Sequence, residues 1–218
     1  MSSRPALPSR RAPADRRAPA DARPRLSAGE RREQLLAVAG RLFAEQGYHG
    51  LSMEALAEAA GVSKPVLYQH FPSKRSLYLA LVRDALAEME AQVRKALEGT
   101  QDNQTRVESS IAAYFGFIED PRFALIVTAE LADEQVRTEV EGAMRRVASG
   151  IGALIAEDAG LSEESAQFLA TAVRGLATEG ARWWVEQAGV DKDRAVRLLA
   201  RLVWRGLGSF GPAVPNES

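Results

Sequence analysis

Apolar residues recur at the three- and four-residue spacing of amphipathic helices along most of the chain, and no segment shows the alternation of a strand. The first helical pattern runs over residues 30–46, where Gly47 supplies a stop. An all-α fold of about nine helices follows from the spacing. The later helices are expected near residues 52–60, 63–71, 73–97, 103–119, 121–129, 133–157, 162–187 and 191–208.

Serines stand where the second, third and fourth of these helices begin. Ser52, Ser63 and Ser73 can each cap a helix, while Gly61 ends the second helix and Pro72 breaks the third. Two short helices joined across a glycine-containing turn form a helix-turn-helix, which lets the second helix enter a DNA major groove.

The segment Gly61-Val-Ser-Lys-Pro-Val-Leu-Tyr-Gln-His-Phe-Pro-Ser-Lys74 resembles the recognition-helix signature of the TetR family of transcriptional regulators. Upstream, Leu42-Phe43, Gly47-Tyr48 and Leu56-Ala57 fall where that family places its first helices, so the resemblance covers about residues 30–82. Ser52 stands where many members have threonine, and the hydroxyl is kept. The resemblance implies a double-stranded DNA partner with a palindromic operator.

Each residue type on the third helix can make a particular contact with DNA. Ser63 and Lys64 can reach base edges or phosphates, and the apolar faces of Pro65 and Val66 can meet thymine methyl groups. The side chains of Tyr68 and His70 can donate hydrogen bonds to phosphates. Ser52 can cap the second helix, contact a phosphate, or do both, and the sequence does not separate these roles. The candidate DNA-binding residues are Ser52, Ser63, Lys64, Pro65, Val66, Tyr68, His70 and Lys74.

Charge is distributed unevenly beneath a formal net charge of −1. Residues 1–25 carry a net charge of +5, so the rest of the chain carries −6. Within that acidic remainder, residues 59–83 contain Lys64, Lys74, Arg75 and Arg83 but no Asp or Glu. A basic stretch without acids is typical of a surface that faces phosphates.

Residues 1–27 are rich in Pro and Arg and repeat Arg-Arg-Ala-Pro-Ala-Asp in tandem. We expect disorder there, because few large apolar side chains are available to offset the entropy of ordering. The segment is then either a solvated tail or a basic arm that follows DNA phosphates.

The second half of the chain is expected to hold a ligand cavity and a dimer interface, as the family resemblance implies. Small residues on the 162–187 helix allow close approach of another helix, and the 191–208 helix adds apolar positions, so these last two long helices are expected to form the homodimer. Five aromatic residues are the candidates for lining the cavity, although aromatics at helical spacing also suit an ordinary core. They are Phe115, Phe117, Phe123, Trp183 and Trp184.

A narrower resemblance concerns the effector. The runs at residues 47–50, 64–71, 77–81 and 115–120 resemble actinobacterial regulators of fatty-acid synthesis that respond to long-chain acyl-CoA. A small hydrophobic effector, acyl-CoA-like in character, is therefore expected. Repression is the family default, and ligand-dependent activation of lipid-metabolism genes is the alternative.

The expected organisation is a basic arm (1–27), a helix-turn-helix domain (28–74, within a family-type region of about 30–91), a ligand-binding and dimerisation domain (75–210) and a flexible tail (211–218). We expect a cytoplasmic location, no membrane span and no cofactor or metal.

An all-helical enzyme or a pure interaction module is the competing hypothesis. The chain has no Cys, both His residues lie in the first 70 positions, and no glycine-rich phosphate loop follows a strand. The acidic pairs Glu157-Asp158 and Glu163-Glu164 flank an expected break and resemble solvated helix ends. We therefore expect no catalytic activity.

Overall fold

The computed structural model describes residues 26–120, 122–123, 133–187 and 189–206, and within these ranges it contains eight helices and no strand. The all-α prediction is therefore confirmed for the described part of the chain. The helix predicted near 121–129 lies outside the described residues except at positions 122–123. The helices are α1 (Ala28–Gly50), α2 (Met53–Ala59), α3 (Lys64–His70), α4 (Lys74–Glu98), α5 (Asn103–Glu119), α7 (Glu134–Ala159), α8 (Glu163–Glu186) and α9 (Lys192–Arg205).

Local signals explain most of the helix ends. Helix α1 begins at Ala28, two residues earlier than predicted, because Ser27 and Glu30 form a reciprocal capping box in which each side chain accepts a hydrogen bond from the other residue's backbone N–H. Gly47 breaks the regular helix as predicted, with a φ of 70° and a ψ of 172° that other residues rarely adopt. The predicted caps Ser52 and Ser73 each accept a backbone hydrogen bond at the start of a helix, and Ser162 and Asp191 do the same for α8 and α9.

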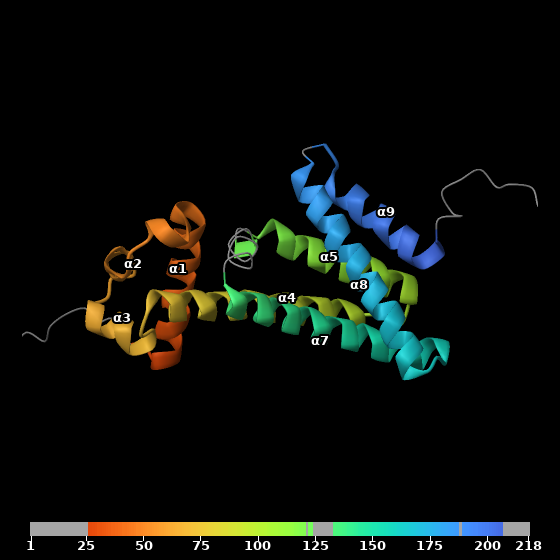
Figure 1. Ribbon diagram of the computed structural model, residues 1–218, viewed down its shortest axis with the longest axis horizontal. Helices are drawn as coiled ribbons and strands as arrows, with labels where there is room; N and C mark the ends of the chain where they lie inside the picture. The colour runs from red at the N-terminus through yellow and green to blue at the C-terminus, as the bar shows by residue number, and fades with distance from the viewer. Residues whose placement is uncertain (1–25, 121, 124–132, 188, 207–218) are drawn as a thin grey trace, which may run out of the picture.

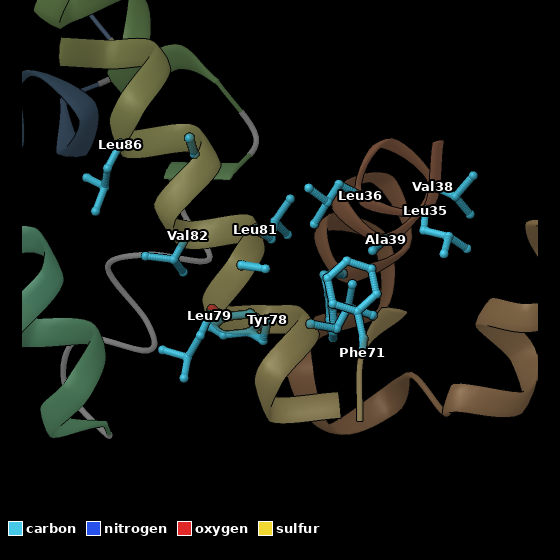
Figure 2. Close-up of a cluster of buried hydrophobic side chains, with 14 of the residues drawn as sticks. Leu35, Leu36, Val38, Ala39, Phe71, Tyr78, Leu79, Leu81, Val82 and Leu86 are labelled. Atoms are coloured by element: carbon cyan, nitrogen blue, oxygen red, sulfur yellow. The ribbon is translucent and has the colours of Figure 1, made fainter. Parts of the chain in front are cut away.

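Helices α1 to α3 share one apolar core with the first turns of α4. Leu35 and Phe43 of α1, Leu56 of α2, Leu67 of α3 and Leu77 of α4 are all nearly inaccessible to solvent. Figure 2 shows part of this core, with Phe71 close to the α1 side chains and Tyr78 on the facing part of α4. The short helices α2 and α3 are thus anchored to two much longer helices.

Helix α4 connects this N-terminal unit to the rest of the molecule. It leaves α1 to α3 at one end and runs alongside α7, while α5, α8 and α9 cover the other side of the bundle (Figure 1). A second apolar cluster joins α5, α8 and α9 through Ile111, Phe115, Ala181 and Val196. Helix α4 therefore contacts both the helix-turn-helix unit and the C-terminal helices.

Among the described residues, no helix combines the length and apolar character that crossing a bilayer requires.

Candidate nucleic-acid interface and ligand cavities

The turn between α2 and α3 sets the direction of the candidate recognition helix. The Ser52 side chain accepts a hydrogen bond from the backbone N–H of Ala55 at 3.1 Å and so caps α2. Gly61 then adopts a φ of 64°, and the N–H of Val62 returns to the carbonyl of Ala57 at 3.0 Å. The left-handed conformation at Gly61 reverses the chain in a few residues, because glycine carries no Cβ to oppose it.

The prediction for Ser63 needs a correction. Ser63 does occupy the N-cap position of α3, but its side chain makes no capping hydrogen bond. Pro65 stands at the second helical position and has no backbone N–H, so one of the two usual donors to a capping side chain is missing. The exposed Ser63 hydroxyl is consequently not used to close α3.

Helix α3 has one face buried in the core and one face exposed to solvent. Leu67 and Phe71 point into the core, at 0% and 2% exposure. On the other side, Lys64 and Pro65 are exposed and the Tyr68 ring remains 42% exposed. Val66 and His70 are half-buried. Hence the outer face of α3 is available to a groove while its inner face fixes the helix in place.

Lys64 and Lys74, the two lysines of the basic stretch, already have partners in this structure. Lys64 Nζ lies 3.0 Å from Glu54 Oε1, and the hydrogen bond from Lys64 lowers the pKa of the Glu54 carboxyl. Lys74 Nζ lies 4.6 Å from the centre of the Tyr48 ring, a cation–π contact. Both contacts are solvent-accessible, so a phosphate could compete for either lysine.

The two arginines of the same stretch face α7. Arg75 forms a two-bond ion pair with Asp133, each bond 3.0 Å long, and lowers the pKa of that carboxyl. Arg83 Nε donates to Glu139 at 2.8 Å. The ion pairs of these two arginines thus link the first half of α4 to α7. Of the four basic residues in the stretch 59–83, only the two lysines are then left as candidates to face phosphates.

Three of the five candidate aromatics meet at one cavity. Phe115, Trp183 and Trp184 line a space of about 530 Å³ between α5, α8 and α9. The Phe115 and Trp184 rings lie 5.4 Å apart, and Trp184 Nε1 donates to the carbonyl of Val190 at 2.7 Å. Trp183, by contrast, is 56% exposed. The cavity therefore opens on the outer face of α8 and α9.

Phe117 and Phe123 are not brought to that cavity. Their rings meet edge to face at 5.6 Å, Phe117 is buried in the core shared with α4, and Phe123 packs against it. These two aromatics are therefore core residues, which was the alternative that their helical spacing left open.

Two adjoining cavities lie between α4, α5, α7 and α8, and one of them extends to α9. The family resemblance implied a cavity in this half of the chain, but none of the residues that line these two was predicted from the sequence. We name them by the arginine that each contains: the Arg106 cavity, of about 370 Å³, and the Arg174 cavity, of about 40 Å³. Apolar residues from separate helices form most of both linings. Helical periodicity indicated which residues face inward but carried no signal for where the facing side chains leave a gap. The two cavities share Ser110, Ile111, Ile151 and Val173.

Comparison with protein families agrees with this architecture. Residues 35–81 match the model of the bacterial regulatory proteins of the tetR family, and residues 92–214 match the tetracyclin repressor-like C-terminal domain. The chain is similar to the transcriptional activator FasR of Mycolicibacterium smegmatis, at 38% identity over 84% of this chain and 85% of the relative. It is also similar to the transcriptional repressor KstR2 of Rhodococcus jostii, at 24% identity over 82% and 92% of the two chains.

Solved structures share the fold. A TetR-like regulator from Rhodococcus sp. RHA1 superposes with a TM-score of 0.64 at 24% identity, covering 84% of this chain and 99% of that one. The regulator FadR of Bacillus subtilis, solved in complex with stearoyl-CoA, superposes with a TM-score of 0.63 at 18% identity, covering 80% and 98%. The helix-turn-helix geometry, the two family matches and the 38% identity to FasR together show that this chain belongs to the TetR family of helix-turn-helix transcriptional regulators.

Proposed function

We propose that the protein is a homodimeric repressor that binds a palindromic operator through α3 and changes its affinity for DNA when a small hydrophobic molecule binds its C-terminal helices. One observation carries the proposal: the N-cap Ser63 and the first helical residues Lys64 and Pro65 are exposed at the start of α3, while Leu67 and Phe71 are buried behind the helix and hold it in place. A short, rigidly seated helix with an exposed first turn is what major-groove docking requires.

Within this proposal, eight residues contact the operator. Ser63 and Lys64 contact base edges or phosphates, Pro65 and Val66 meet thymine methyl groups, and Tyr68, His70 and Lys74 bind phosphates. Ser52 caps α2 in the structure, and its exposed side chain leaves room for a phosphate contact as well.

The division of labour along the chain is also a proposal. Residues 28–74 bind DNA and residues 75–210 bind the effector and the second subunit. This division is supported by the shared core of α1 to α3 and by the two separate family matches. Residues 1–27 are proposed as an accessory segment, either a solvated tail or a basic arm that follows DNA phosphates; of these, only residues 26 and 27 are among the described residues. We place the protein in the cytoplasm, where bacterial DNA is found.

The dimer is proposed to form through α8 and α9. Large apolar side chains on these two helices remain exposed in the single chain, including Phe168 at 72%, Trp183 at 56% and Leu198 at 45%. Apolar surface of this extent on neighbouring helices favours burial against an identical surface. A two-fold axis there would give two α3 helices and hence a palindromic site.

We propose that the effector acts through α4. Helix α4 starts at Lys74, directly after the recognition helix, and ion pairs at Arg75 and Arg83 connect it to α7. An effector that prefers one arrangement of α4 and α7 would move α3 relative to its counterpart across the dimer. A preference of roughly 1 to 3 kcal/mol changes operator affinity about 5- to 150-fold. The stearoyl-CoA bound to FadR supports an acyl-CoA-like effector.

Ligand-dependent activation is the second candidate, favoured by the similarity to FasR, which is named an activator. Both candidates need the same DNA contacts. Transcription in vitro from the upstream promoter, with and without the protein, separates them: repression lowers the yield of transcript and activation raises it.

The test of DNA binding uses fluorescence anisotropy with the full chain and its own upstream intergenic DNA across a salt series. We expect sequence-selective, salt-dependent binding that is lost in Lys64→Ala with Tyr68→Ala. Lys64→Ala alone should reduce the salt slope by roughly one. Arg145→Ala, which alters an exposed residue on α7, is the matched control and should bind as the native chain does. Binding that survives the double substitution would contradict the proposal.

A further inference from the structure

The Arg106 and Arg174 cavities differ in how well their arginines are satisfied. Arg106 donates from all three of its nitrogens: to the carbonyl of Thr100 at 2.8 Å, to Asn103 at 2.9 Å, to Asp158 at 2.8 Å and to Gln101 at 2.9 Å. It therefore ties the start of α5 to the end of α7, and its charge is neutralised by Asp158. Nothing in this arrangement calls for a ligand.

Arg174 has no such set of partners. Its Nε is buried and lacks a hydrogen-bond partner among the described residues. No carboxylate lies among the residues that line the Arg174 cavity. The neighbouring hydroxyls of Ser110 and Thr178 donate to the backbone carbonyls of Val107 and Gly175. A buried guanidinium donor without an acceptor is unfavourable, so a binding partner would remove the cost.

The cavity around Arg174 is lined mainly by apolar residues and adjoins a larger space. Ile111, Ile151 and Val173 line both cavities, so the two lie side by side. Leu154 and Ile155 of α7 and Trp204 of α9 continue the apolar lining of the Arg106 cavity. A molecule in this space would meet apolar side chains along most of its length and, at the α8 end, the unpartnered donor of Arg174.

We propose that Arg174 binds an anionic oxygen of an amphipathic effector whose hydrocarbon part occupies the Arg106 cavity. The inference rests on the proposed function, because it names the charge and the anchoring residue of the effector. The shared chemistry is an anionic group on an aliphatic chain; a free carboxylate and the phosphates of a CoA ester are its two sources. Arg174 would select effectors by their charge. An uncharged molecule with a hydrocarbon chain of equal length leaves the Arg174 guanidinium without a hydrogen-bond partner.

Isothermal titration calorimetry with the full chain tests this inference. The probes are dodecanoate, dodecanoyl-CoA and the uncharged 1-dodecanol, each titrated into the native chain, Arg174→Met, Arg174→Lys and the exposed control Arg145→Met. We expect the native chain to prefer at least one of the two anions to the alcohol. Arg174→Met should weaken binding of that anion roughly 10- to 150-fold and leave binding of the alcohol nearly unchanged.

Two measurements on the Arg174 variants separate an effect on ligand binding from an effect on folding. Arg174→Lys should recover part of the affinity, because it keeps the positive charge. Arg174→Met should melt no lower than the native chain, since it removes an unsatisfied buried donor. The anion whose affinity depends on Arg174 identifies the source of the charged group. Native-chain binding of the alcohol as tight as that of both anions, or anion binding unchanged in Arg174→Met, would overturn the inference.

Operator binding, measured on the same preparations, keeps this result apart from the proposed function. If the native chain binds its operator but Arg174→Met retains full affinity for the anions, only the inference about Arg174 fails. If the native chain binds no operator, the proposed function fails whatever the calorimetry shows.

Discussion

Tyr78 is a buried residue whose ionisation is altered by the fold. Its ring is 5% exposed and lies edge-on to Phe43 at 5.2 Å and to Tyr48 at 5.0 Å. Burial, assisted by Tyr48 and Asp133, raises the pKa of Tyr78 to about 12 from an ordinary value of 10.0. The folded state therefore holds the phenolic proton at a pH where the unfolded chain has released it.

This shift predicts an alkaline loss of stability. The raised pKa means that the contribution of Tyr78 is complete below pH 10 and is lost as the pH rises towards 12. In urea unfolding at pH 8 and pH 11, Tyr78→Phe should lose less stability than the native chain, by roughly 1 kcal/mol at pH 11. Tyr68→Phe, at an exposed position, should keep the native alkaline slope. Equal slopes for Tyr78→Phe and the native chain would refute this explanation.

At the scale of elements, the turn between α2 and α3 depends on one glycine. Gly61 has a φ of 64°, and a Cβ placed there would meet no atom within 4 Å, so only backbone strain opposes a side chain. Gly61→Ala should lower the free energy of unfolding by roughly 1 to 2 kcal/mol. Gly61→Asn should cost less, because asparagine tolerates the left-handed region better.

A second glycine supplies the control. Gly150 lies in the regular interior of α7 with equally open surroundings, so Gly150→Ala should stabilise the protein by roughly 0.5 to 1 kcal/mol. Denaturant unfolding of both alanine variants should therefore give opposite signs. The same sign at the two positions would show that the conformation at Gly61 is not what the turn requires.

The sequence predicted the elements better than it predicted their partners. Helix ends depend on nearby residues such as Ser52, Gly47 and Ser73, so they can be found by reading a few positions at a time. Even there, Pro65 removed one of the two backbone donors that the Ser63 side chain could have used. Arg75 and Asp133 are 58 positions apart, and their pairing depends on how α4 and α7 pack. The candidate site on α3 was predictable because a helix-turn-helix is itself local.

The ligand half shows the same limit more strongly. The aromatic residues were predicted to line the ligand cavity because of their size. In the structure, Phe117 and Phe123 fill the core, while Arg174 lines a cavity. Cavities arise where side chains from four helices fail to fill the space between them. No single segment carries that information, and an arginine at a helical position is usually solvated.

At the scale of the whole molecule, the exposed apolar surface of α8 and α9 predicts the oligomeric state. Light scattering should give twice the 23.6 kDa mass of the single chain. Trp183→Glu places a charge in the centre of the proposed interface and should shift the mass towards that of the monomer. Tyr68→Glu, at an exposed aromatic on α3, should remain dimeric. A monomeric native chain would contradict the proposed dimer.

The ion pair between Lys64 and Glu54 bears on how such a regulator finds its site in a genome. Any DNA that recruits Lys64 must first separate it from Glu54, which leaves a carboxylate close to the phosphates. Random sequence offers little in return, whereas a matched operator adds base contacts along α3. Under the proposed contacts, the cost of separating the pair is the same on any DNA, but only a matched operator offsets it with base contacts. We therefore expect short stays on irrelevant DNA, which leave more copies free to search.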